Sequence, residues 1–249
     1  MRMANSNNST NSTGLLLIGG GGHAISVLEA LHESGALALY ESGALVLHEN
    51  GALAPQSNGC VAILDIPSKV GASLLGVPVI GTDDDLGALR GEYASAFISL
   101  SSIGEWQHRE RLFTLASAHG YDVPNIIHPK AYLSSLSSYA TGAGIFAGMG
   151  ACVNAGCDIG MMCILNTGCV IEHECIVGAY AHIAPGATLC GAVRVGAGAH
   201  IGAGSVVIQG VRVGEGALIG AGSVVVRDIP DGVVAYGNPC RVIRPLITH

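Results

Sequence analysis

An apolar residue recurs at every sixth position through the carboxy-terminal half of the chain. The series runs unbroken over thirteen positions from Val153 to Val225, and each of them is Val, Ile or Leu. A second series of mostly small side chains runs two positions earlier, from Ala151 to Ser223. An α-helix, with its period of about 3.6 residues, does not produce such a pattern, whereas β-helix repeats do. We therefore predict a parallel β-helix over residues 141–229, with both series facing its interior and Thr141 extending the first one.

Glycines and cysteines fit this prediction. Glycine or another small residue often follows the apolar position, as at Gly160 and Gly178, and we expect it there because the chain must turn with little steric cost. Four of the eight cysteines fall in the second series, from Ala151 to Ser223, and no Cys-x-x-Cys pair occurs in the chain. We therefore expect free, buried thiols rather than disulfides or a zinc site, at Cys157, Cys163, Cys169 and Cys175.

The amino-terminal half shows a different pattern. A short apolar run at residues 15–18 is followed by four glycines and then by an amphipathic stretch over 24–33. This order of strand, glycine turn and helix is typical of the start of a βαβ unit. Residues 61–64 and 96–100 read as further strands, and 105–119 as a helix. The pattern predicts a small parallel sheet with helices, which is a Rossmann-like α/β domain.

These patterns divide the chain. Residues 1–13 are mostly Asn, Ser and Thr, and we expect a disordered tail. We assign 14–127 to the α/β domain and 128–249 to the β-helix. Residues 31–54 hold three copies of an eight-residue repeat, of which Leu-His-Glu-Ser-Gly-Ala-Leu-Ala is the first. We interpret them as the end of a helix plus a duplicated insertion, to which we assign no function.

Composition narrows the possible functions. The formal net charge is −7, which argues against nucleic acid as a partner because phosphate binding needs clustered Lys and Arg. Glycine accounts for 37 of 249 residues and interrupts every apolar stretch before it reaches the roughly 18 residues of a membrane span. The first apolar run is too short for the core of a signal peptide. We therefore expect a cytoplasmic protein.

Five segments together carry a family resemblance. They are Leu-Leu-Leu-Ile-Gly-Gly-Gly-Gly-His at 15–23, Leu-Gly-Val-Pro-Val-Ile-Gly at 75–81, Asn-Ile-Ile-His-Pro at 125–129, Asn-Thr-Gly-Cys-Val-Ile-Glu-His-Glu at 166–174 and Gly-Asn-Pro-Cys-Arg at 237–241. With the six-residue repeat, they resemble the sialic acid O-acetyltransferase and nucleotide-sugar N-acetyltransferase family of hexapeptide-repeat acyltransferases. The family includes enzymes that act on bacillosamine and perosamine precursors.

The resemblance implies a left-handed β-helix, a homotrimer with active sites between subunits, and acetyl-CoA as co-substrate, with no bound cofactor and no metal. It implies a nucleotide-linked amino sugar as acceptor. The matching catalytic residues are His173, the general base, and Glu174, which raises its basicity. Acetyl-CoA-binding positions match His182, Gly191, Ala203 and Ala221. Sugar-nucleotide-binding positions match Gly21, Gly22, His23, Asp65, Gly104 and Asn166. The chain departs from many members at Ile25 and Ile66, where Lys and Asp are common.

The spacing of two histidines adds an inference. His173 and His182 are nine residues apart, which is half of a coil of about 18 residues. We therefore expect them on opposite sides of one subunit, so that one site combines His173 of one chain with His182 of the next. Candidates for the donor's phosphates are Arg212, Arg227, Arg241 and Arg244.

Other functions stay open at this level. O-acetylation of sialic acid or another sugar hydroxyl would use the same base and donor as N-acetylation. A noncatalytic trimeric scaffold would make His173 and Glu174 ordinary turn residues. A metal-dependent hydrolyase would need three histidines, two of them about five residues apart, and the β-helix has no such pair. A nicotinamide oxidoreductase is suggested only by the glycine turn.

Overall fold

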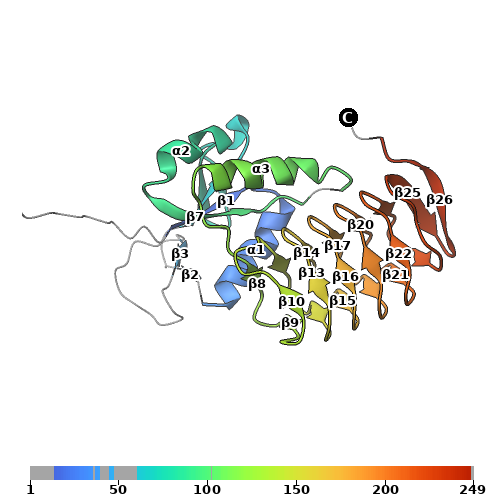
Figure 1. The fold of residues 1–249 in the computed structure, drawn as a ribbon. Helices are drawn as coiled ribbons and strands as arrows, with labels where there is room; N and C mark the ends of the chain where they lie inside the picture. Colours follow the sequence, from blue (N-terminus) through green and yellow to red (C-terminus); the bar gives the residue numbers. More distant parts are fainter. Residues whose placement is uncertain (1–13, 36, 40–44, 48–60, 102, 248–249) are drawn as a thin grey trace, which may run out of the picture.

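The computed structural model describes residues 14–35, 37–39, 45–47, 61–101 and 103–247, which form an α/β domain followed by a long β-helix (Figure 1). The predicted tail, residues 1–13, and most of the eight-residue repeats at 31–54 lie outside the described residues. Two short strands within these repeats, β2 (Leu37–Leu39) and β3 (Leu45–Leu47), pair antiparallel.

The α/β domain is built on a sheet whose strands run in the order β5-β6-β4-β1-β7. Its elements are β1 (Gly14–Ile18), α1 (Gly22–Glu33), β4 (Val61–Leu64), β5 (Ser73–Leu74), β6 (Val77–Gly81), α2 (Leu86–Leu89), β7 (Tyr93–Ile98) and α3 (Gln107–Ala118). Strands β6, β4, β1 and β7 are parallel. Strand β1 lies beside both β4 and β7, so the chain leaves β1 in one direction and returns on its other side. This is the point at which ligands bind in open α/β sheets, and the expected Rossmann-like domain is confirmed.

The β-helix has three faces, each a parallel ladder of two-residue strands. The first face is formed by β8 (Ile126–Ile127), β11 (Phe146–Ala147), β14 (Ile164–Leu165), β17 (His182–Ile183), β20 (His200–Ile201) and β23 (Leu218–Ile219). The second comprises β9 (Tyr132–Leu133), β12 (Cys152–Val153), β15 (Val170–Ile171), β18 (Thr188–Leu189), β21 (Val206–Val207) and β24 (Val224–Val225). The third comprises β10 (Ser138–Tyr139), β13 (Asp158–Ile159), β16 (Ile176–Val177), β19 (Arg194–Val195) and β22 (Arg212–Val213).

The hairpin of β25 (Val233–Gly237) and β26 (Cys240–Pro245) extends the first face and closes its end. Both predicted series point inward, and the four cysteines of the second series are at most 1% exposed. Their burial raises the pKa of the Cys163, Cys169 and Cys175 thiols to about 12, so these thiols are protonated filler.

The β-helix begins earlier than predicted, at Ile126. The prediction failed because the first coil is two residues longer than the others. Phe146 pairs with Ile126, twenty positions back, whereas Ile164 and His182 are eighteen apart. The extra residues shift the phase, so Tyr139 packs inward while Thr141, which we expected to extend the series, is exposed.

The glycines that follow the inner apolar positions serve another purpose than the one expected. Gly160, Gly178 and Gly196 have no left-handed backbone. A Cβ there would lie 2.4–2.6 Å from the backbone nitrogen of the next coil. Close approach of successive coils therefore excludes a side chain, and the left-handed turn falls two residues later, as at Gly198 (φ +63°).

The α/β domain packs against the first coils of the β-helix. Phe146 and Ile164, which point outward from the first face, join a buried cluster with Leu17 and Leu28 of the domain. Helix α3 lies along the corner between the third and first faces (Figure 1), where Met162 and Tyr180 join its core with Leu112.

Candidate active site

A histidine and a carboxylate stand together at the corner between the second and third faces. His173 and Glu174 follow β15, and His173 Nδ1 lies 3.1 Å from Glu174 Oε2. Both side chains are exposed, by 62% and 71%. When Nδ1–H donates a hydrogen bond to the carboxylate, Nε2 carries the lone pair and can accept a proton from a substrate.

One coil further along, Gly191 forms a floor beneath this imidazole. A Cβ at Gly191 would lie 2.6 Å from both Cε1 and Nε2 of His173. The ring therefore rests on the glycine, with its Nε2 edge over a position that has no side chain. The corner is also tied to the preceding coil, where Asn154 Nδ2 donates to Glu172 Oε2 at 2.8 Å. The structure thus brings together three of the predicted residues, namely His173, Glu174 and Gly191.

His182 lies elsewhere, pointing outward from the first face. Its Nε2 is 3.2 Å from Asn166 Nδ2, and its ring meets that of His200, one coil further, edge to face at 4.7 Å. Burial lowers the pKa of His200 to about 4, so this histidine is neutral. Asn166, which we expected at the sugar nucleotide, therefore lies beside the histidine expected to contact acetyl-CoA.

Ala203 and Ala221 are exposed at the corner between the first and second faces, one coil apart. The amide of Gly222, beside Ala221, donates to the carbonyl of Ala203 at 2.8 Å. The second face separates this corner from the one that carries His173. Within one chain the predicted catalytic base therefore lies beside Gly191 but away from the other predicted donor-binding residues, which are His182, Ala203 and Ala221.

The glycine turn of the α/β domain has a tight half and an open half. Gly20 is confined, because a Cβ there would lie 2.8 Å from Asp65 Oδ2, whereas a Cβ at Gly21 or Gly22 would meet nothing within 4 Å. These two open glycines lead into the amino terminus of α1, where free backbone amides favour an anion.

Asp65 braces this turn. Its carboxylate accepts the amides of Gly20 (2.8 Å) and Ile66 (2.7 Å) and the Lys69 ammonium (2.9 Å). Partial burial works to raise the pKa of Asp65, but the hydrogen bonds from Lys69, Ile66 and Gly20 outweigh it and hold the pKa below its usual value.

His23 faces inward instead of toward the open glycines. Its side chain is 7% exposed and meets the Phe146 ring edge to face at 4.7 Å. Burial first, and then the nearby Arg109 charge, lower the pKa of His23 to about 3, so the imidazole is neutral. Its backbone, at the start of α1, is the part that belongs to the turn.

A cavity of about 210 Å³ opens at the carboxyl ends of β1 and β4. Gly19, Asp65, Asp83, His108 and Arg111 are among its lining residues, and Arg111 pairs with Asp83 at 2.8 Å. Sequence reasoning found only Asp65 of these; His108, Arg111 and its partner Asp83 come together through the packing of α3. Gly104, which has a left-handed backbone (φ +80°), is not among the residues that line the cavity. It lies against Leu218 and Leu246.

The part of the chain that the structure describes was searched for metal sites and for membrane-spanning helices. There, no three His, Cys, Asp or Glu side chains gather as a metal site would require. In the same residues, no helix has the length and apolar character needed to cross a bilayer.

Comparisons with known proteins agree with this fold. Residues 192–227 match the family model described as bacterial transferase hexapeptide (six repeats). A search of curated proteins found no match. Among solved structures, a histidine-to-asparagine variant of perosamine N-acetyltransferase from Caulobacter crescentus, in complex with CoA and GDP-perosamine, is 35% identical. The match covers 92% of this chain and 96% of that one, with a TM-score of 0.77.

The acetyltransferase domain of PglB from Neisseria gonorrhoeae, in complex with acetyl coenzyme A, is 31% identical. The match covers 93% of this chain and all of that one, with a TM-score of 0.76. WeeI from Acinetobacter baumannii shares the fold at 22% identity and a TM-score of 0.74, over 92% of this chain and 99% of its own.

Proposed function

The chain belongs to the nucleotide-sugar N-acetyltransferase family of hexapeptide-repeat enzymes, and on this premise we propose that it transfers the acetyl group of acetyl-CoA to the amine of a nucleotide-linked amino sugar. The observation that carries the proposal is the His173 imidazole, which rests on Gly191 with Glu174 at its Nδ1 and its Nε2 edge open.

The proposed reaction is a direct transfer. The sugar amine attacks the thioester carbonyl, a nitrogen–carbon bond forms, and His173 Nε2 accepts the proton that the amine loses. The carbon–sulfur bond then breaks, and the CoA thiolate takes the proton back from the imidazolium. The Glu174 carboxylate stabilises the imidazolium while it exists. No acyl-enzyme is needed, because the thioester is already activated and both substrates can meet directly. The buried thiols of Cys169 and Cys175 are held protonated, which makes them poor nucleophiles.

We further propose that each active site lies between two subunits of a homotrimer. From β12 onward, the outward side chains of the second face are half-buried and mostly apolar, namely Cys152, Val170, Thr188, Val206 and Val224. If this face packs against neighbouring copies, its two edges meet those of other chains. One edge carries His173, and the other carries Ala203 beside the His182 face. The pairing would supply the base from one chain and the donor-binding residues from the next.

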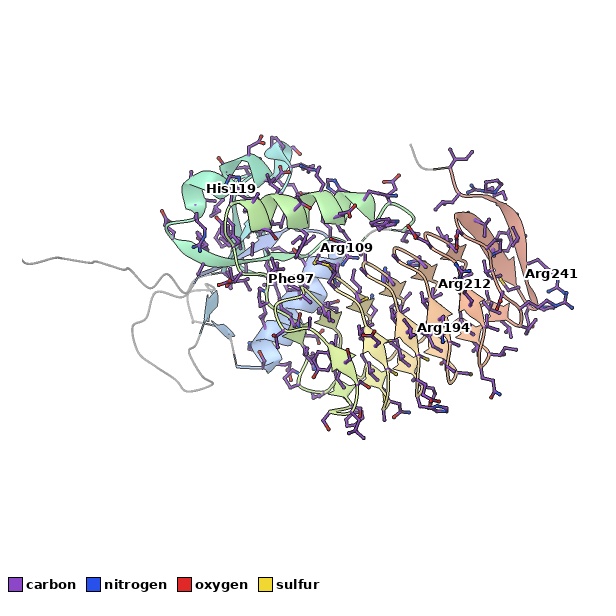
Figure 2. The ribbon with its side chains drawn as sticks, in the orientation of Figure 1. Phe97, Arg109, His119, Arg194, Arg212 and Arg241 are labelled. Atoms are coloured by element: carbon purple, nitrogen blue, oxygen red, sulfur yellow. The ribbon has the colours of Figure 1, made fainter. Side chains whose placement is uncertain are left out.

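Each substrate has a proposed place. The nucleotide enters the cavity beside Asp83 and Arg111, and its diphosphate reaches the open amides at Gly21 and Gly22. Acetyl-CoA follows the small residues Ala203 and Ala221. Arginines stand out toward the carboxy-terminal end, and Figure 2 shows Arg194 and Arg212 on the third face and Arg241 on the final hairpin. Arg212 also pairs with Asp231 at 3.2 Å. Arg212, Arg227, Arg241 and Arg244 are the proposed contacts of the donor's phosphates.

The test is the release of free CoA thiol from acetyl-CoA with nucleotide-linked amino sugars, free amino sugars and sialic acid as acceptors. We expect turnover on a nucleotide-linked amino sugar. Replacement His173→Ala should lower kcat by about 10²–10⁴-fold, the usual contribution of a positioned base, with acetyl-CoA binding retained. His119→Ala, an exposed histidine at the end of α3, is the matched control and should behave as wild type.

Turnover on sialic acid alone would move the assignment to O-acetylation. An unchanged rate in His173→Ala would remove this histidine from the mechanism, and no turnover on any acceptor would refute the proposed activity.

A further inference from the structure

Helix α3 contacts both the proposed nucleotide cavity and the β-helix. His108, Arg111 and Leu112 on one side of the helix line the cavity of the α/β domain. Arg109 points the other way, between α3 and the coils (Figure 2), and is only 1% exposed. One helix therefore joins the cavity to the β-helix.

Arg109 binds two successive coils at the corner between the third and first faces. Its Nη2 donates to the carbonyl of Met162, and its Nη1 donates to that of Tyr180 at 3.3 Å. Trp106, just before α3, packs on the same corner with its ring 5.5 Å from that of Tyr180, and covers Gly198 closely. Tyr180 is two residues before His182, so the contact fixes the start of the strand that carries this histidine.

The chemistry of this contact differs from that of simple packing. In the described residues, Arg109 forms no ion pair with a carboxylate. Burial lowers its pKa to about 10, so the guanidinium remains charged near neutral pH. A buried charge carries a desolvation cost that an apolar residue of similar volume would avoid. A stabilising contact alone does not require an arginine here.

The β-helix side of the contact is strained. Met162 and Tyr180 have left-handed backbones (φ +57° and +62°) at a corner where the equivalent residues Gly144, Gly198 and Gly216 are glycine. Backbone strain of this kind persists only where the surrounding structure requires it. A charged group on one side and two strained residues on the other therefore meet at a single place.

We propose that Arg109 is a positioning residue that sets the register of α3 on the β-helix, and with it the distance between the nucleotide cavity and His182. The planar guanidinium suits this role because it presents donors in a rigid fork that spans two carbonyls one coil apart. The inference rests on the proposed function, since the distance matters only if the nucleotide-linked sugar and acetyl-CoA occupy these two places and must meet.

The experiment compares Arg109→Met, which keeps much of the packing volume, with Arg90→Met. Arg90 also donates to a backbone carbonyl, that of Gly120 at 3.0 Å, but within the α/β domain. For each variant we would measure kcat on the nucleotide-linked amino sugar, the Kd of CoA, the Kd of GDP and UDP as probes, and the melting temperature. We expect Arg109→Met to lower kcat by about ten- to a hundred-fold, as small misplacements of reacting groups do, while each Kd changes less than about two-fold. Arg90→Met should retain kcat.

An unchanged kcat in Arg109→Met would overturn the proposal. So would a loss of CoA or nucleotide binding as large as the loss of kcat, because the residue would then be merely structural. If Arg109→Met does not fold, Arg109→Lys keeps the charge without the fork and should show the same separation of kcat from Kd at smaller amplitude. Absence of wild-type turnover would refute the proposed function itself, whereas normal wild-type turnover with an unaffected variant would refute only the role of Arg109.

Discussion

The contact between His173 and Gly191 allows the candidate base to be displaced without touching it. In Gly191→Ala the new Cβ would lie 2.6 Å from Cε1 and Nε2 of His173, whereas ordinary contact begins near 3.4 Å. The difference requires the ring to move by roughly 0.8 Å or to rotate away from Glu174. A displacement of about 1 Å can cost on the order of 10²-fold in rate, so we expect kcat to fall by about that factor. The amide of residue 191 is retained, and the change is purely steric.

Stability should hardly change in this variant, because the atoms that must move belong to an exposed side chain. We expect the free energy of unfolding to stay within about 0.5 kcal/mol of wild type. Gly178→Ala is the contrasting control: its Cβ would lie 2.6 Å from the backbone nitrogen of Ala197, and we expect a loss of about 1–3 kcal/mol. Rates of CoA release and urea denaturation check both. A normal kcat in Gly191→Ala would refute a role for the imidazole in its observed position.

Two further predictions concern acid stability and subunit pairing. Burial holds the pKa of His200 at about 4, so between pH 6.5 and 4 this histidine is protonated in the unfolded chain but neutral in the folded one. Stability should therefore fall as the pH drops from about 6.5 towards 4. The slope from this residue is at most about 1.4 kcal/mol per pH unit, and urea denaturation of His200→Leu should show it removed; an undiminished slope would contradict this. For the trimer, equal amounts of His173→Ala and His182→Ala, unfolded and refolded together, should recover about one quarter of wild-type activity, since each site needs one intact histidine from each of two chains. No recovery would place both histidines in the same chain's site.

The β-helix was predictable because its side chains repeat with the backbone. An inward position every six residues leaves few alternatives, and the ladder from Val153 to Val225 is buried throughout. The first coil was not predicted, because its two extra residues lie before Ala147 and shift the six-residue phase. A period records spacing, so it cannot reveal a coil of different length.

The candidate site was only partly accessible from sequence. His173 and Gly191 are eighteen residues apart, one full coil, so their contact could have been read from the repeat itself. Asp83, His108 and Arg111 meet through the angle at which α3 crosses the sheet, and no spacing encodes that angle. Arg109 reads in sequence as an ordinary surface charge of an amphipathic helix, and only the docking of α3 on the corner buries it.

The departures from glycine in the β-helix point to the same two places as the site geometry. From residue 144 to 222, every sixth residue has a left-handed backbone, and ten of these fourteen are glycine. The other four are Met162, Glu174, Tyr180 and Ala192. Glu174 holds the His173 imidazole and Ala192 follows its glycine floor, while Met162 and Tyr180 offer the carbonyls that Arg109 binds. Strain that glycine would relieve persists where other requirements outweigh it, and here it marks the proposed base and the proposed α3 contact.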